Sequence, residues 1–253
     1  MEPVAKRRNW KREETIIALA LYHQIPFGSF CKTNRRIIEV AALLGRTPSA
    51  LTMKLCNLAR FDETLQARNV GGLANGSRMD KDVWDEFYGK TAALAVENAK
   101  LLEKLKYASA EDIPPGMVKE DTAFYRIGQD FFRNAILSNY EGTCCMTGIA
   151  VPRLLIASHI KPWVDATAEE KTNPANGLCL NALHDRAFDQ GLITVATDYT
   201  IHVSSELKRS KKLDDMTKRL IMDRDGEKII LPHRFQPSRE FLEYHNDVIF
   251  MHG

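Results

Sequence analysis

The segment from residue 159 to residue 189 contains the side chains that phosphodiester hydrolysis needs. His159 is followed after 17 residues by Asn176, then after 9 by Asp185 and after 4 more by Asp189. A histidine titrates near neutral pH and can take a proton from water, and an asparagine can fix its ring without competing for that proton. Carboxylates with an imidazole suit Mg²⁺, Mn²⁺ or a similar ion, which would offset charge on the phosphorane.

The elements expected to position these side chains are two strands and a helix, over residues 153–160, 177–180 and 181–191. The helix is expected to begin at an N-cap, Asn181, and to end at Gly191. An interval of four residues places Asp185 and Asp189 one turn apart on one helical face, where both can reach a single cation. His184 is a rival ligand beside them.

These segments resemble the HNH endonuclease family, in the branch that reads Ala-Ser-His-Ile-x-Pro-Trp, then Asn-Gly-Leu, then Phe-Asp-x-Gly-Leu. The matching segments are Leu155–Trp163, Asn176–Leu180 and Asp185–Leu192, and the resemblance extends over about residues 124–253. It implies a ββα-metal fold in which His159 is the general base and Asn176 orients it. The resemblance implies metal ligands among His184, Asp185 and Asp189. One position departs: many relatives have a ligand immediately before the base, where this chain has Ser158.

The resemblance therefore implies a metal-dependent DNA endonuclease, with Mg²⁺ preferred over Mn²⁺ or another transition metal, similar to predicted restriction enzymes. The alternative is a DNA-binding protein with a degenerate, inactive nuclease domain, as Ser158 would allow. An RNA substrate is less favoured because the sequence shows no aromatic stacking platform. If both strands are cut with one active site per chain, a homodimer is expected.

The first 106 residues predict a helical domain that binds double-stranded DNA. Helices at about residues 35–44 and 50–59 flank a tight turn at Gly45, which is typical of a helix-turn-helix, and a long helix is expected over residues 81–106. The start of the second helix of such a motif enters the major groove. Base contacts are therefore expected from Arg46, Ser49, Thr52 and Lys54. A helical packing or dimerisation domain is the alternative.

The charge distribution agrees with a nucleic-acid partner. Residues 1–106 hold 18 Lys/Arg and 12 Asp/Glu, whereas residues 107–253 hold 17 and 21. A positive first half and a negative second half are expected if one binds phosphate and the other holds a cation. Further phosphate contacts beside the nuclease core are expected from Arg126, Gln129, Arg133 and Lys161.

The composition, with 44% hydrophobic and 27% charged residues among 253, suits one large or two small domains. We predict an α+β protein: an all-helical domain over residues 1–106, a linker over 107–121 containing Pro114–Gly116, and a nuclease domain over 122–253 with flanking helices and a β-hairpin at 192–204. Five scattered cysteines without a C-x-x-C pair argue against a disulfide scaffold or structural zinc. Without a secretory signal or an apolar run of about 20 residues, a cytoplasmic protein with no membrane partner is expected.

Overall fold

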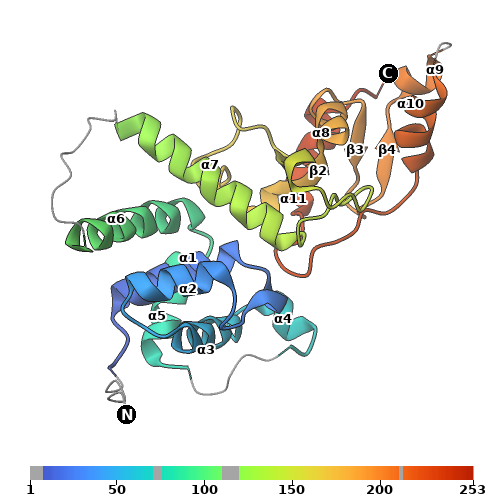
Figure 1. Cartoon of the computed structure of the whole chain (residues 1–253). Coiled ribbons are helices and arrows are strands. Elements are labelled where there is room, and N and C mark those ends of the chain that lie inside the picture. The colour runs from blue at the N-terminus through green and yellow to red at the C-terminus, as the bar shows by residue number, and fades with distance from the viewer. Residues whose placement is uncertain (1–7, 71–75, 110–119, 211–212, 253) are drawn as a thin grey trace. The chain divides into compact units, whose positions relative to one another are not determined.

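The computed structural model describes residues 8–70, 76–109, 120–210 and 213–252. The chain divides into two compact units, residues 1–23 with 27–119 and residues 24–26 with 120–253 (Figure 1). Pro114–Gly116 of the predicted linker lies outside the described residues. No described helix is long and apolar enough to cross a membrane.

The first unit is built from helices. They are α1 (Arg12–Gln24), a 3₁₀ turn (Phe27–Ser29), α2 (Arg35–Leu43), α3 (Pro48–Ala59), α4 (Glu63–Ala67), α5 (Arg78–Phe87) and α6 (Thr91–Ser109). The predicted pair of helices around a tight turn is confirmed as α2 and α3. Gly45 in the turn adopts a φ of +59°, which glycine tolerates best. The Thr47 hydroxyl caps α3 by accepting a hydrogen bond from the Ala50 N–H at 3.2 Å.

The predicted long helix over residues 81–106 is wrong, because it consists of α5 and α6 with a break between them. Gly89 in the break has a φ of +69°, which an α-helix does not accommodate. Ser77 and Asp80 form a capping box that starts α5 earlier than predicted. The apolar positions of both helices keep helical spacing, so periodicity alone does not reveal the break.

The second unit combines helices with two small antiparallel sheets. Its elements are α7 (Glu120–Asn139), β1 (Leu155–His159), β2 (Gly177–Asn181), α8 (Ala182–Asp189), β3 (Ile193–Val195), β4 (Ile201–Val203), α9 (Ser205–Arg209), α10 (Asp215–Leu220), α11 (Arg239–Tyr244) and a π-helical turn (His245–Ile249), with 3₁₀ turns at Pro152–Leu154, Pro174–Asn176 and Met222–Arg224. Strand β1 pairs with β2 so that His159 lies opposite Gly177. The mixed α+β class and the predicted hairpin, β3–β4, are confirmed.

The C-terminal part of the second unit is less regular. Lys228 forms a single bridge with Thr200. Helix α11 ends at Tyr244 and continues directly as the π-helical turn. π-Helical turns occur frequently at functional sites.

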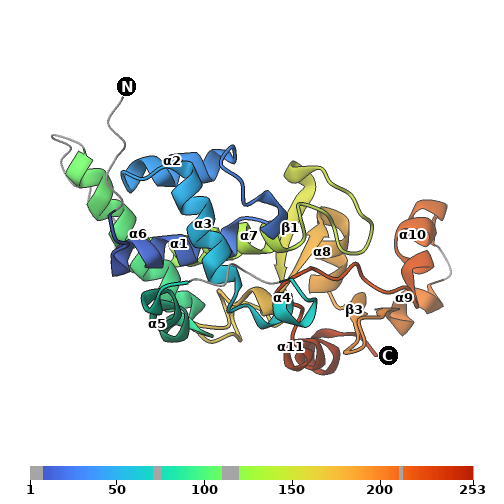
Figure 2. The ribbon, with the colours of Figure 1, turned by 90° about the horizontal axis from the view of Figure 1, so that it is seen from below.

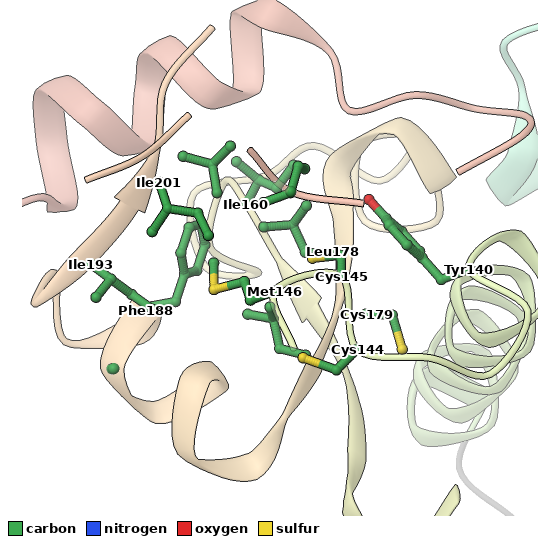
Figure 3. Close-up of a cluster of buried hydrophobic side chains, with 14 of the residues drawn as sticks. Tyr140, Cys144, Cys145, Met146, Ile160, Leu178, Cys179, Phe188, Ile193 and Ile201 are labelled. Atoms are coloured by element: carbon green, nitrogen blue, oxygen red, sulfur yellow. The ribbon is translucent and has the colours of Figure 1, made fainter. Parts of the chain in front are cut away.

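The core of the second unit lies between α7, the two sheets and α8. Figure 3 shows Leu178 and Cys179 of β2, Phe188 of α8 and Ile193 and Ile201 of the hairpin gathered in one buried cluster. Helix α7 packs so tightly on β2 that a Cβ on Gly177 would lie 2.3 Å from Ile136 Cδ1 and 2.7 Å from Phe132 Cζ. The glycine therefore fixes the distance between α7 and the strand that lies opposite His159.

Candidate active site

Strand β1, the loop after it, α8 and the π-helical turn line one cleft of about 460 Å³. Figure 2 shows β1 and α8 side by side. His159 from the end of β1 and Asp185 and Asp189 from α8 all line this cleft. Three of the side chains predicted to carry chemistry, separated by up to 30 residues in the chain, thus come together.

The His159 ring is held on three sides. Its Nε2 lies 2.9 Å from the Lys171 carbonyl oxygen. The ring stacks on Phe132 of α7 with centroids 3.8 Å apart and planes 12° apart, and Trp163 packs edge-on at 5.3 Å. Because a carbonyl oxygen can only accept, the proton of the neutral ring lies on Nε2 and Nδ1 keeps its lone pair.

The protonation state of His159 follows from its surroundings. Burial lowers the pKa of His159, the hydrogen bond to the Lys171 carbonyl raises it, and the Lys171 ammonium lowers it again, with burial the largest effect. The net shift is downward, so the neutral form is the main one at pH 7. Nδ1 is therefore available to accept a proton at neutral pH.

Asn176 contacts the backbone of the loop between β1 and β2. Its Oδ1 accepts from the Lys161 N–H at 2.8 Å, and its Nδ2 donates to the carbonyls of Lys161 and Glu170 at 3.2 and 3.1 Å. Glu170 immediately precedes Lys171, whose carbonyl holds His159. An influence of Asn176 on the ring of His159 therefore passes through this loop.

Helix α8 presents the two carboxylates from a well-defined start. Asn181 caps the helix, with its Oδ1 accepting from the N–H groups of Leu183 and His184, both at 3.1 Å, as predicted. Gly191 ends it at a φ of +67°, and a Cβ there would lie 2.2 Å from the Ile249 carbonyl oxygen. The Asn181 cap and the positive φ of Gly191 are local signals that the sequence shows, whereas the close approach of Ile249 to Gly191 comes from the tertiary structure.

The two carboxylates of α8 bind protons more readily than free aspartates do. Burial raises the pKa of Asp185, against smaller lowering effects from Ser158 and Arg186. Burial also raises the pKa of Asp189, and the negative charge of Asp185 raises it further, whereas Arg186 lowers it. Among the described residues neither carboxylate forms an ion pair within 4 Å, so the two negative charges face one cleft without a closed counter-ion.

His184 points elsewhere. Its side chain is buried, with Nδ1 3.0 Å from Asn181 Oδ1 and Nε2 2.9 Å from the Leu220 carbonyl oxygen. These contacts connect α8 to the end of α10, and His184 does not line the cleft. Its position gives no support to His184 as a metal ligand.

Comparison with protein families assigns the segment that builds this cleft. Residues 144–196 match the sequence model of the HNH endonuclease family. The chain contains an HNH endonuclease domain. The match covers β1, β2, α8 and β3, and it indicates a nuclease that acts on nucleic acid. No curated protein matched the chain.

The HNH domain offers oxygen ligands that fit a divalent cation. Asp185 and Asp189 lie one helical turn apart and line the same cleft, and the negative charge of Asp185 raises the pKa of Asp189. A cation between them would remove that repulsion, and hard cations prefer carboxylate oxygen. No group of three or more His, Cys, Asp or Glu side chains among the described residues could hold a metal. The pair would therefore need additional oxygen ligands of another kind.

Two of the residues predicted to contact DNA bases, Arg46 and Lys54, form ion pairs inside the helical unit. Arg46 Nη2 lies 2.7 Å from the Glu14 carboxylate and the side chain is 7% exposed, while Lys54 is buried in an ion pair with Asp80. Both cations pack over the ring of Trp10, at 4.1 and 4.6 Å from its centroid. These contacts hold the fold and do not favour base contacts by either side chain.

The other residues predicted to contact DNA differ in how exposed they are. The hydroxyl of Thr52 is buried and Ser49 is exposed. In the HNH domain, Arg126, Gln129 and Arg133 are exposed on α7, and Arg133 also donates to the Leu155 carbonyl at 3.1 Å. Lys161 is engaged by the Glu170 carboxylate at 2.9 Å. Arg126 and Arg133 of α7 are therefore more accessible than Arg46 and Lys54.

Three side chains that line the cleft or pack on His159 were not predicted from the sequence. Phe132 and Trp163 fix the His159 ring, and only the tertiary structure shows this. Arg186 lies between the two aspartates in the sequence, lines the cleft and is exposed. Its position beside Asp185 on a short helix is the one signal that could have identified it.

Proposed function

We propose that this protein is a metal-dependent DNA endonuclease in which His159 is the general base. The observation that carries the proposal is the arrangement of His159: its Nε2 is committed to the Lys171 carbonyl, and the ring lines the same cleft as Asp185 and Asp189. A base with a free lone pair and two carboxylates facing one cleft is what metal-assisted hydrolysis of a phosphodiester requires.

The proposed reaction is attack of water on phosphorus. Nδ1 of His159 takes a proton from the water as its oxygen forms the new bond to phosphorus. The bond from phosphorus to the leaving sugar oxygen breaks, and that oxygen takes a proton from solvent. A divalent cation, when bound, offsets negative charge on the phosphorane and on the leaving oxygen. Asp185 and Asp189 would hold this cation, with Mg²⁺ preferred.

The substrate phosphate needs positive groups beside the acidic pair. Arg186 lines the cleft and its charge lowers the pKa of both Asp185 and Asp189, so its guanidinium acts close to them. We assign it the role of binding a non-bridging phosphate oxygen, which an arginine fork does well. Arg126, Gln129 and Arg133 on α7 would contact the neighbouring backbone without reading sequence.

Double-stranded DNA is the proposed substrate and restriction or defence the proposed role. The α2–α3 pair around the Gly45 turn supports DNA over RNA. Base contacts would come from exposed residues such as Ser49, because Arg46 and Lys54 are engaged within the fold. A homodimer would supply the second active site that cleavage of both strands needs.

Cleavage of supercoiled plasmid tests the function. Modified and unmodified plasmid are incubated with wild type, His159→Ala and Asp185→Ala in Mg²⁺, Mn²⁺ or EDTA. We expect metal-dependent nicking or linearisation by wild type and a loss of about 10²–10⁴-fold in His159→Ala. His202→Ala, which changes an exposed histidine of β4, is the control and should cleave normally.

Two results would redirect the proposal. If wild type shifts DNA in a gel but leaves every plasmid intact in every ion, the HNH domain is degenerate and the protein binds DNA without cutting it. If His159→Ala cleaves as fast as wild type, another group is the base.

A further inference from the structure

A buried hydroxyl next to the catalytic histidine has no closed hydrogen bond. Ser158 precedes His159 in β1, its side chain is 3% exposed, and its Oγ has no partner of normal hydrogen-bond geometry among the described residues. A buried polar atom without a partner costs free energy. Where native structures keep such an atom, a bound water or ion is a common explanation.

The hydroxyl lies on the α8 side of the strand. Neighbouring residues of a strand point to opposite faces, and because His159 stacks on Phe132 of α7, Ser158 is directed toward α8. It lines the cleft together with Asp185 and Asp189. Its hydroxyl lies within reach of the Asp185 carboxylate, and even a hydroxyl that donates to a carboxylate keeps its own oxygen lone pairs for a cation.

We propose that Ser158 Oγ is the third protein oxygen of a cation site whose other two ligands are Asp185 and Asp189. The inference rests on the proposed function, because it assumes that the two aspartates hold a cation. It also supplies a third protein ligand. No third His, Cys, Asp or Glu among the described residues lies with this pair, but a serine hydroxyl can bind Mg²⁺.

The charges of the three groups match a hard divalent ion. Two carboxylates carry a charge of −2 and the hydroxyl is neutral, so the set balances one divalent cation without excess negative charge. Three oxygen ligands leave the other positions of an octahedral ion to water and phosphate, as Mg²⁺ prefers. Softer metals, which favour sulfur, should bind this set less well than manganese or magnesium.

Replacing the oxygen by sulfur tests direct ligation. The full chain without DNA is titrated with Mn²⁺ and with Cd²⁺ by calorimetry, as wild type, Ser158→Ala and Ser158→Cys. We expect Ser158→Ala to weaken Mn²⁺ binding by about 10–100-fold, as loss of one group of a metal site commonly does. Ser158→Cys should weaken Mn²⁺ binding and strengthen Cd²⁺ binding, with a new cadmium–thiolate absorption band.

Ser138→Cys is the matched control. Ser138 is a buried serine of α7 whose Oγ also lacks a partner, and it does not line the cleft. Its cysteine variant, with Cys144, Cys145 and Cys179 present as in wild type, reports how much cadmium binds to buried thiols in general. Thermal unfolding of each variant confirms the fold, and Ser158→Ala should unfold no lower than wild type because it removes an unsatisfied hydroxyl.

The outcomes separate the inference from the proposed function. If Ser158→Ala binds Mn²⁺ like wild type and Ser158→Cys gains no cadmium affinity over Ser138→Cys, the inference fails and Ser158 holds only a water. If Asp185→Asn nevertheless abolishes Mn²⁺ binding, the cation site of the proposed function stands without Ser158. If Asp185→Asn also leaves Mn²⁺ binding unchanged, the cation site itself is wrong. Should Ser158→Cys fail to fold, Ser158→Ala decides alone.

Discussion

Lys54 and Asp80 in the helical unit and Asp185 and Asp189 in the HNH domain are both pairs of neighbouring charged side chains, but they differ in what balances them. The first pair joins opposite charges whose side chains are 3% and 1% exposed. The second joins like charges that face a cleft and have no closed ion pair among the described residues. A closed pair needs nothing from outside the fold, whereas like charges in one cleft are stabilised by a bound cation.

This difference separates charges that are neutralised within the fold from charges that face a cleft without an ion pair. Arg46 and Lys54 have the residue types of DNA contacts, yet their partners are Glu14, Asp80 and the ring of Trp10. The carboxylates of α8 have the opposite property, since they face a cleft and form no ion pair within 4 Å among the described residues. Residue type alone therefore says less than the partner does.

Removing one member of the closed pair should have the largest effect on stability. Lys54→Ala leaves the Asp80 carboxylate buried without its cation, and we expect a loss of about 3–5 kcal/mol in the free energy of unfolding. Chemical denaturation followed by tryptophan fluorescence measures it. Arg35→Ala, which breaks a surface pair with a 91% exposed arginine, should change stability by less than about 1 kcal/mol. Equal losses in the two variants would show that the Lys54 pair is not structural.

Crowding beneath the base should have the next largest effect. Gly177→Ala places a Cβ against Ile136 and Phe132, and overpacking of this kind costs about 1–3 kcal/mol. Because Phe132 stacks on His159, plasmid cleavage should fall further than the loss of folded protein explains. Gly28→Ala, at a position with open space around it, is the control. Normal cleavage by Gly177→Ala would mean that Phe132 does not position His159.

Relieving the like charges should stabilise the fold and abolish function. The pKa of Asp185 is raised in the folded state, so its charged form costs stability at pH 7 and that cost disappears as pH falls through the folded pKa. Asp185→Asn should raise the free energy of unfolding by about 0.5–1 kcal/mol at pH 7, while cleavage is lost. A loss of stability would contradict the comparison between the two pairs.

Asp198 is a carboxylate whose pKa is lowered in the folded state, so its replacement should change the free energy of unfolding in the opposite direction to that of Asp185. Its carboxylate pairs with Lys228 at 2.8 Å and bonds to Thr200, and these contacts hold its pKa well below the usual range. A lowered carboxyl pKa contributes stability at neutral pH that is lost as pH falls. Asp198→Asn should therefore slightly destabilise the protein at pH 7.

The pH dependence of cleavage should show the smallest of these effects. Because the pKa of His159 is lowered, the acid limb of kcat/KM should lie below pH 6.5, and activity should be level above it as far as this group is concerned. Lys171→Met removes a charge that lowers this pKa, so the limb should move slightly toward higher pH. A limb at or above pH 6.5 in wild type would exclude His159 in this environment as the base.

The sequence predicts the HNH core well because its signals are local. Asn181 and Gly191 mark the ends of α8, and the interval between Asp185 and Asp189 places both on one face. The break at Gly89 escapes prediction because the apolar spacing continues across it. The choice between His184 and Asp185 also needs the structure, since the Leu220 carbonyl that engages His184 lies 36 residues away.

The contacts of the helical unit are also poorly predicted, because the residues that pair are far apart in the sequence. Lys54 and Asp80 are 26 residues apart, and Arg46 and Glu14 are 32 apart, so no local pattern pairs them. Ser158 shows the same limit in the HNH domain. The sequence marks it only as a departure from the family pattern, whereas the structure shows an unsatisfied oxygen beside Asp185.

The last wall of the cleft comes from the π-helical turn, which is held by stacking of His245 on Phe188 and by a hydrogen bond from the Met251 N–H to the Gly191 carbonyl. During synthesis on a ribosome, His159 and Asp189 leave the exit tunnel well before residues 245–251. A nascent chain thus carries the base and the carboxylates before it can enclose them. Completion of the cleft therefore waits for the synthesis of residues 245–251.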